Sequence, residues 1–325
     1  MKQTNFFLHI SKIILFSGIL VATASARAEL KVVTTIKPLH SLISNVMDGV
    51  GEPGLIIDGS ISPHSFTMKP SHAKMLEEAD VIFWIGESIE TSMEEPLDSI
   101  AKDAEVIEFM ELDSIAKLKF REESIFGDHD DHDDHDDHDD HDDHDDHDDH
   151  DDHDDHDDHA GHEGHNHGEF DAHIWLDPSN AKEMVHEIAH ELGDLDPANK
   201  DKYEANAEAT IKVLDQLISD VGTDINSDAK FVVFHDAYQY FEERFGVRAA
   251  GALTLNTDVL PGAKQIADIQ DVIKDKGIKC IFSEPQFNPK IITTIAEDMN
   301  IKTGVFDPLG ANIDPGKSLY FKLIS

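Results

Sequence analysis

The chain has 325 residues, with 26 Lys plus Arg against 68 Asp plus Glu, which gives a formal net charge of −42 at pH 7. This acidity excludes a nucleic-acid-binding protein on electrostatic grounds. Half of the excess is local, because 21 Asp lie between Asp128 and Asp158, and a chain with 39% hydrophobic residues overall can still bury a core of about two domains.

The N-terminus has the three regions of a secretory signal. Lys2 is followed by an apolar run from Ile13 to Ala22 and then by Ala26-Arg27-Ala28. The run is about half of the roughly twenty residues that a membrane span needs. We therefore expect residues 1–28 to be a signal peptide cleaved after Ala28, and the mature protein to be exported and soluble.

After the signal, short β-branched runs alternate with amphipathic segments, and this pattern occurs twice. The first series predicts an N-terminal lobe over residues 29–127, completed by 169–178, and the second a C-terminal lobe over 223–325. The predicted strands are Val32 to Ile36, Leu55 to Ile57, Val81 to Ile85, Val106 to Phe109, Phe231 to Phe234, Val247 to Ala252, Cys280 to Ser283 and Thr303 to Phe306. The fold class is therefore α/β, with a mainly parallel sheet flanked by helices in each lobe.

A long helical region at 179–222 separates the two series. It is interrupted near Asp196-Pro197, since proline suits a first helical turn. We interpret it as a rigid linker between the lobes. Ligands of open α/β sheets bind beyond the carboxyl ends of strands, so a site is expected in the cleft between the lobes.

Residues 128–168 contain a literal Asp-Asp-His repeat, from Asp130 to His159. The segment has almost no apolar residues to offset chain entropy, so we expect a disordered surface loop. The acidic residues alone could be a solvated tract, but a histidine at every third position favours weak metal binding. Its histidines are His129, His132, His135, His138, His141, His144, His147, His150, His153, His156, His159, His162, His165 and His167.

Four other side chains stand where a cleft ligand should be. His64 follows the second predicted strand, His235 ends the fifth, Asp307 follows the last, and His173 lies just before the linker. A single strand-end histidine is more often a capping or core residue than a ligand. Three imidazoles with a carboxylate or water, however, suit four-coordinate Zn²⁺, and the shared position of these residues predicts a zinc site.

Six segments carry a family resemblance, in order over nearly all of the mature chain. They are Val33 to Leu42, Pro63 to Ser71, Asp171 to Pro178, Phe234 to Tyr238, Ser283 to Phe287 and Asp307 to Gly310. They resemble the ZnuA family, the periplasmic solute-binding proteins of high-affinity zinc ABC transporters, which carry a His-rich loop at this point.

This resemblance implies a periplasmic two-lobed protein, not an enzyme, that holds Zn²⁺ with His64, His173 and His235. The fourth ligand is expected to be Asp307 or water, because Pro63 stands where some members have Glu. Manganese-binding relatives replace one of the histidines, so zinc is favoured. The implied partners are the permease and ATPase subunits of the importer, with a periplasmic zinc chaperone as a further candidate.

The chain departs from the family at two points, its cysteine with the chain end and His72. Cys280 is the only cysteine, although some members pair a cysteine here with one after a final helix, and this chain ends at Ser325 before such a helix. We expect Cys280 to be buried and inert. His72 replaces a usual Asp and is interpreted as a surface residue at a helix start, and His40 as a packing histidine or a group behind the metal ligands.

The linker also carries a zinc-protease pattern, His186-Glu187-Ile188-Ala189-His190. In such proteases the two histidines bind zinc from one helix face and the glutamate activates water. The apolar stripe of this helix lies on the other side, so both histidines should face solvent. A secreted metalloprotease remains the alternative function, together with a manganese-binding paralogue.

Overall fold

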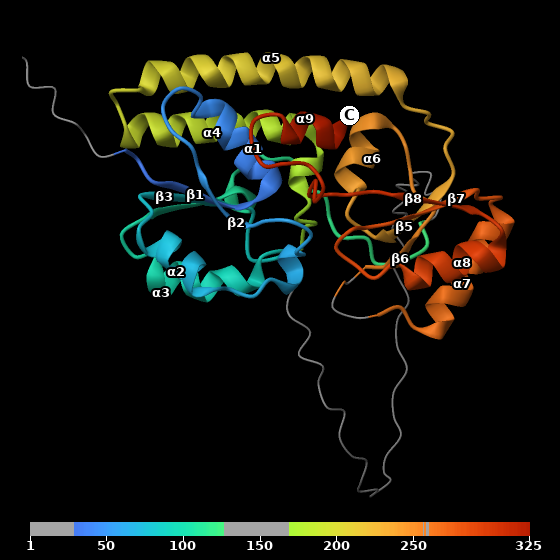
Figure 1. Ribbon diagram of the computed structural model, residues 1–325. Helices are drawn as coiled ribbons and strands as arrows, with labels where there is room; N and C mark the ends of the chain where they lie inside the picture. The colour runs from blue at the N-terminus through green and yellow to red at the C-terminus, as the bar shows by residue number, and fades with distance from the viewer. Residues whose placement is uncertain (1–28, 127–168, 256, 258–259) are drawn as a thin grey trace, which may run out of the picture.

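The computed structural model describes residues 29–126, 169–255, 257 and 260–325. The predicted signal peptide and the Asp/His repeat with its fourteen histidines lie outside these residues. Figure 1 shows two α/β lobes side by side with a long helix running over both. Among the described residues, no helix combines the length and the apolar character that a bilayer span requires.

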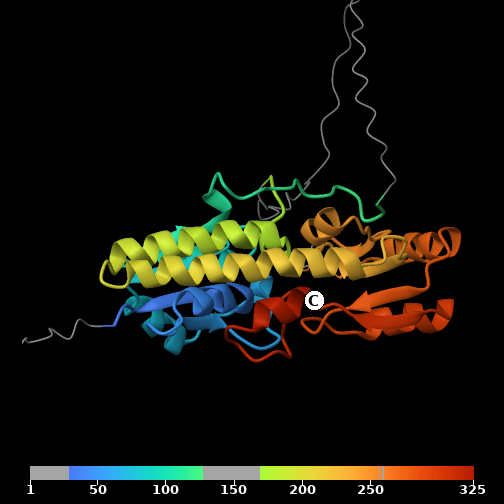
Figure 2. The same ribbon diagram turned by 90° about the horizontal axis from the view of Figure 1, so that it is seen from above.

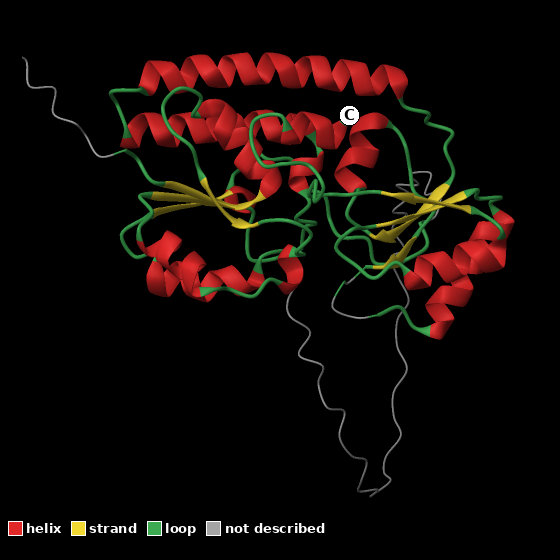
Figure 3. Ribbon diagram, viewed as in Figure 1, coloured by secondary structure: helices red, strands yellow, loops and turns green. Residues whose placement is uncertain are grey.

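The N-terminal sheet is parallel, with strand order β2-β1-β3-β4. Every residue of the central strand β1 is buried, because helices cover both faces of the sheet (Figure 3). Val33 pairs with Gly54 on one side and Ile82 on the other. The elements are β1 (Val32–Ile36), α1 (Lys37–Val46), β2 (Gly54–Ile57), α2 (Pro70–Glu77), β3 (Val81–Trp84), α3 (Glu94–Ile100) and β4 (Glu105–Glu108).

The C-terminal sheet repeats this arrangement, with order β6-β5-β7-β8 and all pairs parallel. Alternate residues of β5 serve two faces: Val232 and Phe234 pack in a core confined to this lobe, whereas Phe231 and Val233 join the core shared with the N-terminal lobe. The elements are β5 (Phe231–His235), α6 (Gln239–Phe245), β6 (Ala252–Thr254), α7 (Ala263–Asp275), β7 (Cys280–Ser283), α8 (Lys290–Met299) and β8 (Lys302–Val305). The predicted fold class, two α/β lobes each with a mainly parallel sheet, is confirmed.

One strand is displaced from its predicted position. The strand expected from Val247 begins only at Ala252. There the chain is paired with residues 118–126, which we call the strap: Ala252 donates its N–H to the Ser124 carbonyl (2.8 Å), and Phe126 donates to the Ala250 carbonyl (3.1 Å). The strap, green in Figure 2, thus crosses from the N-terminal lobe to the edge of the C-terminal sheet.

The helical region is a hairpin of α4 (Pro178–Leu195) and α5 (Lys200–Asp224), which turns at the interruption expected near Asp196. The turn is fixed by Asp196, whose carboxylate accepts from the Asn199 amide (2.6 Å) and the Tyr203 hydroxyl (3.2 Å). Helix α4 packs on α1 in the N-terminal lobe. Helix α5, 25 residues and about 37 Å long, reaches over both lobes (Figure 2).

The end of the chain returns to the N-terminal lobe. Helix α9 (Leu319–Ile324) packs on α1 and α5. The buried ammonium of Lys37 donates to the carbonyls of Gly310 (2.8 Å) and Ile313 (2.7 Å) in the preceding segment. The lobes are therefore joined by α5, by the strap and by the C-terminal segment.

Cys280, at the start of β7, is half-buried, and burial raises the pKa of its thiol.

A fully buried carboxyl group, Glu90, gives the N-terminal lobe a pH-dependent stability. It accepts from the N–H groups of Ile85 (2.8 Å) and Gly86 (3.3 Å) after β3, and burial raises its pKa from the usual 4.5 to about 7. Between these two pH values the folded chain retains a proton that the unfolded chain releases. The free energy of unfolding should therefore fall as pH rises from 4.5 to about 7.

We expect Glu90→Gln to remove this pH-dependent loss of stability, because the amide does not titrate and its oxygen can still accept from both N–H groups. At pH 8 the variant should be more stable than the wild type by up to about 3 kcal/mol, and near pH 4 the two should be equal. Urea unfolding at both pH values measures the difference. Glu87→Gln, at an exposed site in the same turn, is the control, and parallel pH profiles for all three proteins would contradict the prediction.

Candidate metal centre

Three histidines from distant parts of the chain meet between the lobes. His64 lies in a short helical turn, Pro63–Ser65, after β2, and His235 is the last residue of β5. His173 precedes a second short turn, Ile174–Leu176, which leads into α4. His173 and His235 are buried and His64 is half-buried. The topology therefore brings together two strand ends and the start of the helical hairpin.

The geometry of the three rings suits a single small cation. Their ligand nitrogens all lie within 4.8 Å of one another, and the Nε2 atoms of His173 and His235 are 3.2 Å apart. Tetrahedral Zn²⁺ with Zn–N bonds of about 2.0–2.1 Å places its nitrogens about 3.4 Å apart. The cavity that the rings enclose has a volume of about 10 Å³, room for one water-sized particle.

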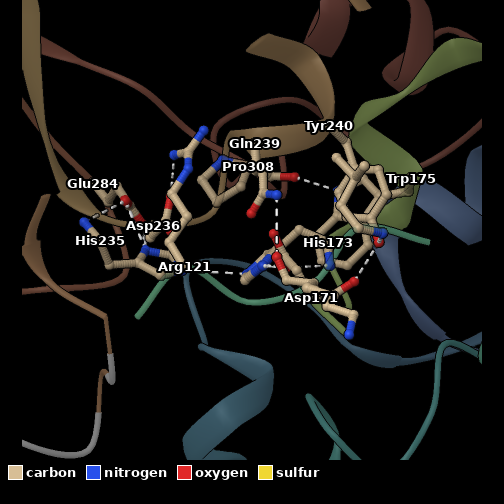
Figure 4. Close-up of polar contacts among 12 residues, drawn as sticks. Arg121, Asp171, His173, Trp175, His235, Asp236, Gln239, Tyr240, Glu284 and Pro308 are labelled. Carbon is tan, nitrogen blue, oxygen red and sulfur yellow. Dashed lines mark hydrogen bonds and ion pairs between the residues drawn. The ribbon is translucent and has the colours of Figure 1, made fainter. Parts of the chain in front are cut away.

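Two buried carboxylates fix the orientation of the imidazoles (Figure 4). The Nδ1 atom of His173 lies 2.7 Å from Asp171, and Nδ1 of His235 lies 2.8 Å from both oxygens of Glu284. A carboxylate only accepts, so each Nδ1 carries the hydrogen, and a neutral ring presents the lone pair of its Nε2 to the cavity. At 3.2 Å the two Nε2 atoms can share one proton, and a cation held by both nitrogens would take the place of that proton.

Burial and charge also set the protonation of these rings. Burial, with His235 beside it, lowers the pKa of His173, which keeps this imidazole neutral. Burial acts in the same direction on His235, but the carboxylates of Glu284, Asp236 and Asp171 together outweigh it and raise the pKa of His235. Burial raises the pKa of Asp171 to about 7. A carboxylate behind each imidazole is the arrangement that orients metal-binding histidines and increases their basicity.

The structure does not bring Asp307 into this group. Its Oδ1 accepts from the Gln286 amide (3.0 Å) and the Leu309 N–H (3.2 Å), and its Oδ2 accepts from the Ala311 N–H (2.6 Å). Both oxygens thus stabilise the turn after β8. The carboxylate that borders the cavity is Glu284, whose role the sequence analysis did not assign, although it follows the end of β7.

The two other histidines singled out in the sequence also lie elsewhere. His40 is half-buried, with Nε2 3.1 Å from the Pro53 carbonyl, so it is a packing residue of α1. His72 lies in the first turn of α2, where its Nδ1 accepts from the Lys69 N–H (3.2 Å). This agrees with the predicted position at a helix start.

Comparison with known proteins decides the family. The family model "ZnuA: Zinc-uptake complex component A periplasmic" matches residues 32–325. The chain belongs to the ZnuA family. A high-affinity zinc uptake system protein ZnuA from Brucella abortus is 50% identical over 295 residues, covering 90% of this chain and 88% of that protein. The Yersinia pestis protein of the same description is 31% identical over 313 residues, covering 96% and 93%.

Solved structures agree with the fold of this ZnuA family member. A crystal structure of ZnuA superposes with a TM-score of 0.68 at 22% identity, covering 91% of this chain and 96% of that one. At this identity the likeness bears on the fold alone. The resemblance predicted from the six sequence segments is thus confirmed.

Sequence reasoning missed Arg121, a strap residue with two buried partners (Figure 4). Its guanidinium donates to Asp236 (2.7 Å) and Glu242 (2.6 Å), and it lies over the Phe126 ring, 4.1 Å from the centroid. Asp236 directly follows the candidate ligand His235. An isolated Arg in a loop gives no sequence signal for such a contact.

The protease pattern does not form a catalytic centre among the described residues. His186 and His190 are exposed on α4, and the one group of three or more potential metal ligands found there is His64, His173 and His235. A zinc protease needs a third ligand and a walled cleft at its histidines. Relatives are zinc-uptake proteins, which gives the alternative no support.

We therefore expect Glu187→Gln to leave function unchanged. The affinity of the cleft for Zn²⁺ should stay within about twofold of the wild type, since Glu187 is far along α4 from the three histidines. Competition with a chromogenic chelator measures this affinity, and casein digestion tests catalysis. Casein cleavage by the wild type that disappears in the variant would restore the protease hypothesis.

Proposed function

We propose that the protein captures Zn²⁺ with His64, His173 and His235 in the interlobe cleft and delivers it to an ABC-type zinc importer. The observation that carries this proposal is the convergence of three imidazoles, from three separate elements, within 4.8 Å. Membership of the ZnuA family supports zinc as the cargo and the permease and ATPase subunits as partners.

For the fourth position we propose water. Asp307 would have to give up hydrogen bonds to Gln286, Leu309 and Ala311 in order to reach the metal. Glu284 already holds the Nδ1 atom of His235. Three protein nitrogens with an exchangeable fourth ligand suit a protein that must release its metal.

We further propose that the chain is exported by residues 1–28 and acts in the periplasm, where a zinc chaperone is a further candidate partner. The histidines of segment 128–168 would collect metal at lower affinity. The described residues on either side of this segment support such a role, because they are paired with each other close in sequence to a cleft histidine. Lys119 pairs with Phe170, and Asp171 donates its N–H to the Leu118 carbonyl (2.8 Å), two residues before His173.

A titration of the chain without the Asp/His repeat tests the proposal. Phe120 donates its N–H to the Glu169 carbonyl (3.4 Å), and Phe126, six residues further along the strap, can lie up to about 20 Å from Glu169. Direct fusion of the segment ends would strain the strap, so residues 128–167 should be replaced by about eight Gly/Ser residues. We expect one tight Zn²⁺ per chain and weaker Mn²⁺.

Isothermal titration calorimetry of this variant with each metal separates the outcomes. Tight binding of one Zn²⁺ that survives the replacement supports the cleft. Loss of all tight binding would place the tight site in the repeat and overturn the proposal. Tighter binding of Mn²⁺ than of Zn²⁺ would identify a manganese carrier instead.

A further inference from the structure

A second pair of histidines lies on α4, outside the cleft. His186 and His190 are one helical turn apart and both are exposed, His190 with 60% of its side chain accessible. His186 is eight residues after Pro178, about 12 Å along the helix axis from its start. The pair therefore cannot share an ion with the three histidines of the cleft.

The helix places both imidazoles on one polar arc. At about 100° per residue they differ by only about 40°, whereas the buried residues Met184, Ile188 and Leu192 lie on the other side. Histidines at positions i and i+4 of one helix face are spaced to bind the same transition-metal ion. Because the backbone fixes this spacing, only side-chain rotation is needed to close the chelate.

Carboxylates lie on one side of the pair. Asp194 lies 4.0 Å from Nε2 of His190, and Glu187 and Glu191 follow between this arc and the buried stripe. Glu191 also meets Glu105 of β4: burial raises the pKa of Glu191, and the Glu105 and Glu187 carboxylates raise it further. Like-charged groups packed in this way favour a nearby divalent cation.

The neighbouring lysines do not occupy this position. Lys182 is held by Asp215 of α5 (2.6 Å), and Lys200 by the other oxygen of Asp194 (2.8 Å). Both ammonium groups are thus paired with carboxylates, and neither lies between the two imidazole rings and the solvent.

We propose that His186 and His190 form a second Zn²⁺ site on the outer face of α4, with water completing the coordination. This site is weaker than the cleft, because its rings are exposed and no buried carboxylate fixes their Nδ1 atoms. It does not depend on the Asp/His repeat, and it stands whether or not the cleft delivers zinc to an importer.

Residue-level footprinting of the full chain tests the site. Diethyl pyrocarbonate modifies free imidazole nitrogens, and trypsin cleavage after Lys182 and Lys200 releases one peptide, 183–200, whose only histidines are His186 and His190. The histidines of the repeat and of the cleft fall in other peptides. The modification of each histidine is followed by mass spectrometry as Zn²⁺ is titrated.

We expect both histidines to be protected with the same half-saturating Zn²⁺ concentration. His190→Ala should raise the concentration that protects His186 by at least about tenfold, because one of two protein ligands is lost. Alanine favours the helix at this exposed position, so the fold is retained, which circular dichroism checks. His72→Ala, on α2, is the matched control and should leave the protection of His186 unchanged.

Two results would overturn the site. One is the absence of protection of His186 and His190 up to millimolar Zn²⁺. The other is protection of His186 that is the same in His190→Ala as in the wild type, which would show that the residues do not share an ion. Neither result affects the cleft, whose binding is read separately from the tryptic peptide 231–244, in which His235 is the only histidine.

Discussion

Replacement of either buried histidine of the cleft, as in His173→Ala or His235→Ala, should lower the affinity for Zn²⁺ by at least about 100-fold, or about 2.7 kcal/mol. Each change removes one of the three ligand nitrogens, in each case from a ring whose Nδ1 atom is fixed by a buried carboxylate. It also leaves Asp171 or Glu284 without its imidazole partner near the cation. The measurement is competition with a zinc chelator in the chain whose Asp/His repeat is replaced.

The controls separate loss of a ligand from loss of folding. His72→Ala removes a histidine that caps α2 and should keep wild-type zinc affinity. His235→Gln keeps a polar side chain of similar length at the end of β5 and should fail as His235→Ala does, because an amide is a poor zinc ligand. Affinities within threefold of the wild type for both His173→Ala and His235→Ala would show that the cleft is not the tight site.

The fold was predictable because each buried strand is a short β-branched run. β1 and β7 have the bounds expected from the sequence, and β5 extends one residue further, to His235. Ligands of open α/β sheets bind beyond the carboxyl ends of strands, so His64 after β2 and His235 after β5, one in each lobe, predicted a common site in the cleft between the lobes. The strand expected from Val247 begins only at Ala252, because Val247 still donates its N–H to the Glu242 carbonyl of α6 and residues 250–252 pair with the strap, a contact between segments far apart in the sequence.

The remainder of the site depends on side-chain contacts that no local pattern encodes. Asp307 follows β8, as a ligand would, yet three hydrogen bonds within its own turn take up its carboxylate. Glu284 occupies an equivalent place after β7 and faces His235 instead. The position of a residue after a strand thus identifies candidate carboxylates for the metal site. Which of these carboxylates reaches the histidines depends on its rotamer and on the N–H groups beside it.

The buried ion network of the strap, which the sequence did not reveal, should contribute strongly to stability. Arg121 bridges Asp236 and Glu242 across separations of 115 and 121 residues, and the three side chains are 19%, 6% and 3% exposed. Removing the cation leaves two carboxylates buried close to each other and to Asp171. We expect Arg121→Ala to lower the free energy of unfolding by about 3–5 kcal/mol, measured by urea unfolding without metal at pH 7.

A matched arginine and a combined variant test the cause of this loss. Arg244 makes a two-pronged pair with Asp177 at 2.7 Å, but its side chain is 35% exposed, so Arg244→Ala should cost only about 1 kcal/mol. A variant that combines Arg121→Met, Asp236→Asn and Glu242→Met leaves no unpaired charge at this place. If uncompensated charge causes the destabilisation of Arg121→Ala, the combined variant should recover at least half of the lost free energy of unfolding. An equal loss in the single and the combined variants would instead assign the effect to the packing of Arg121 on Phe126.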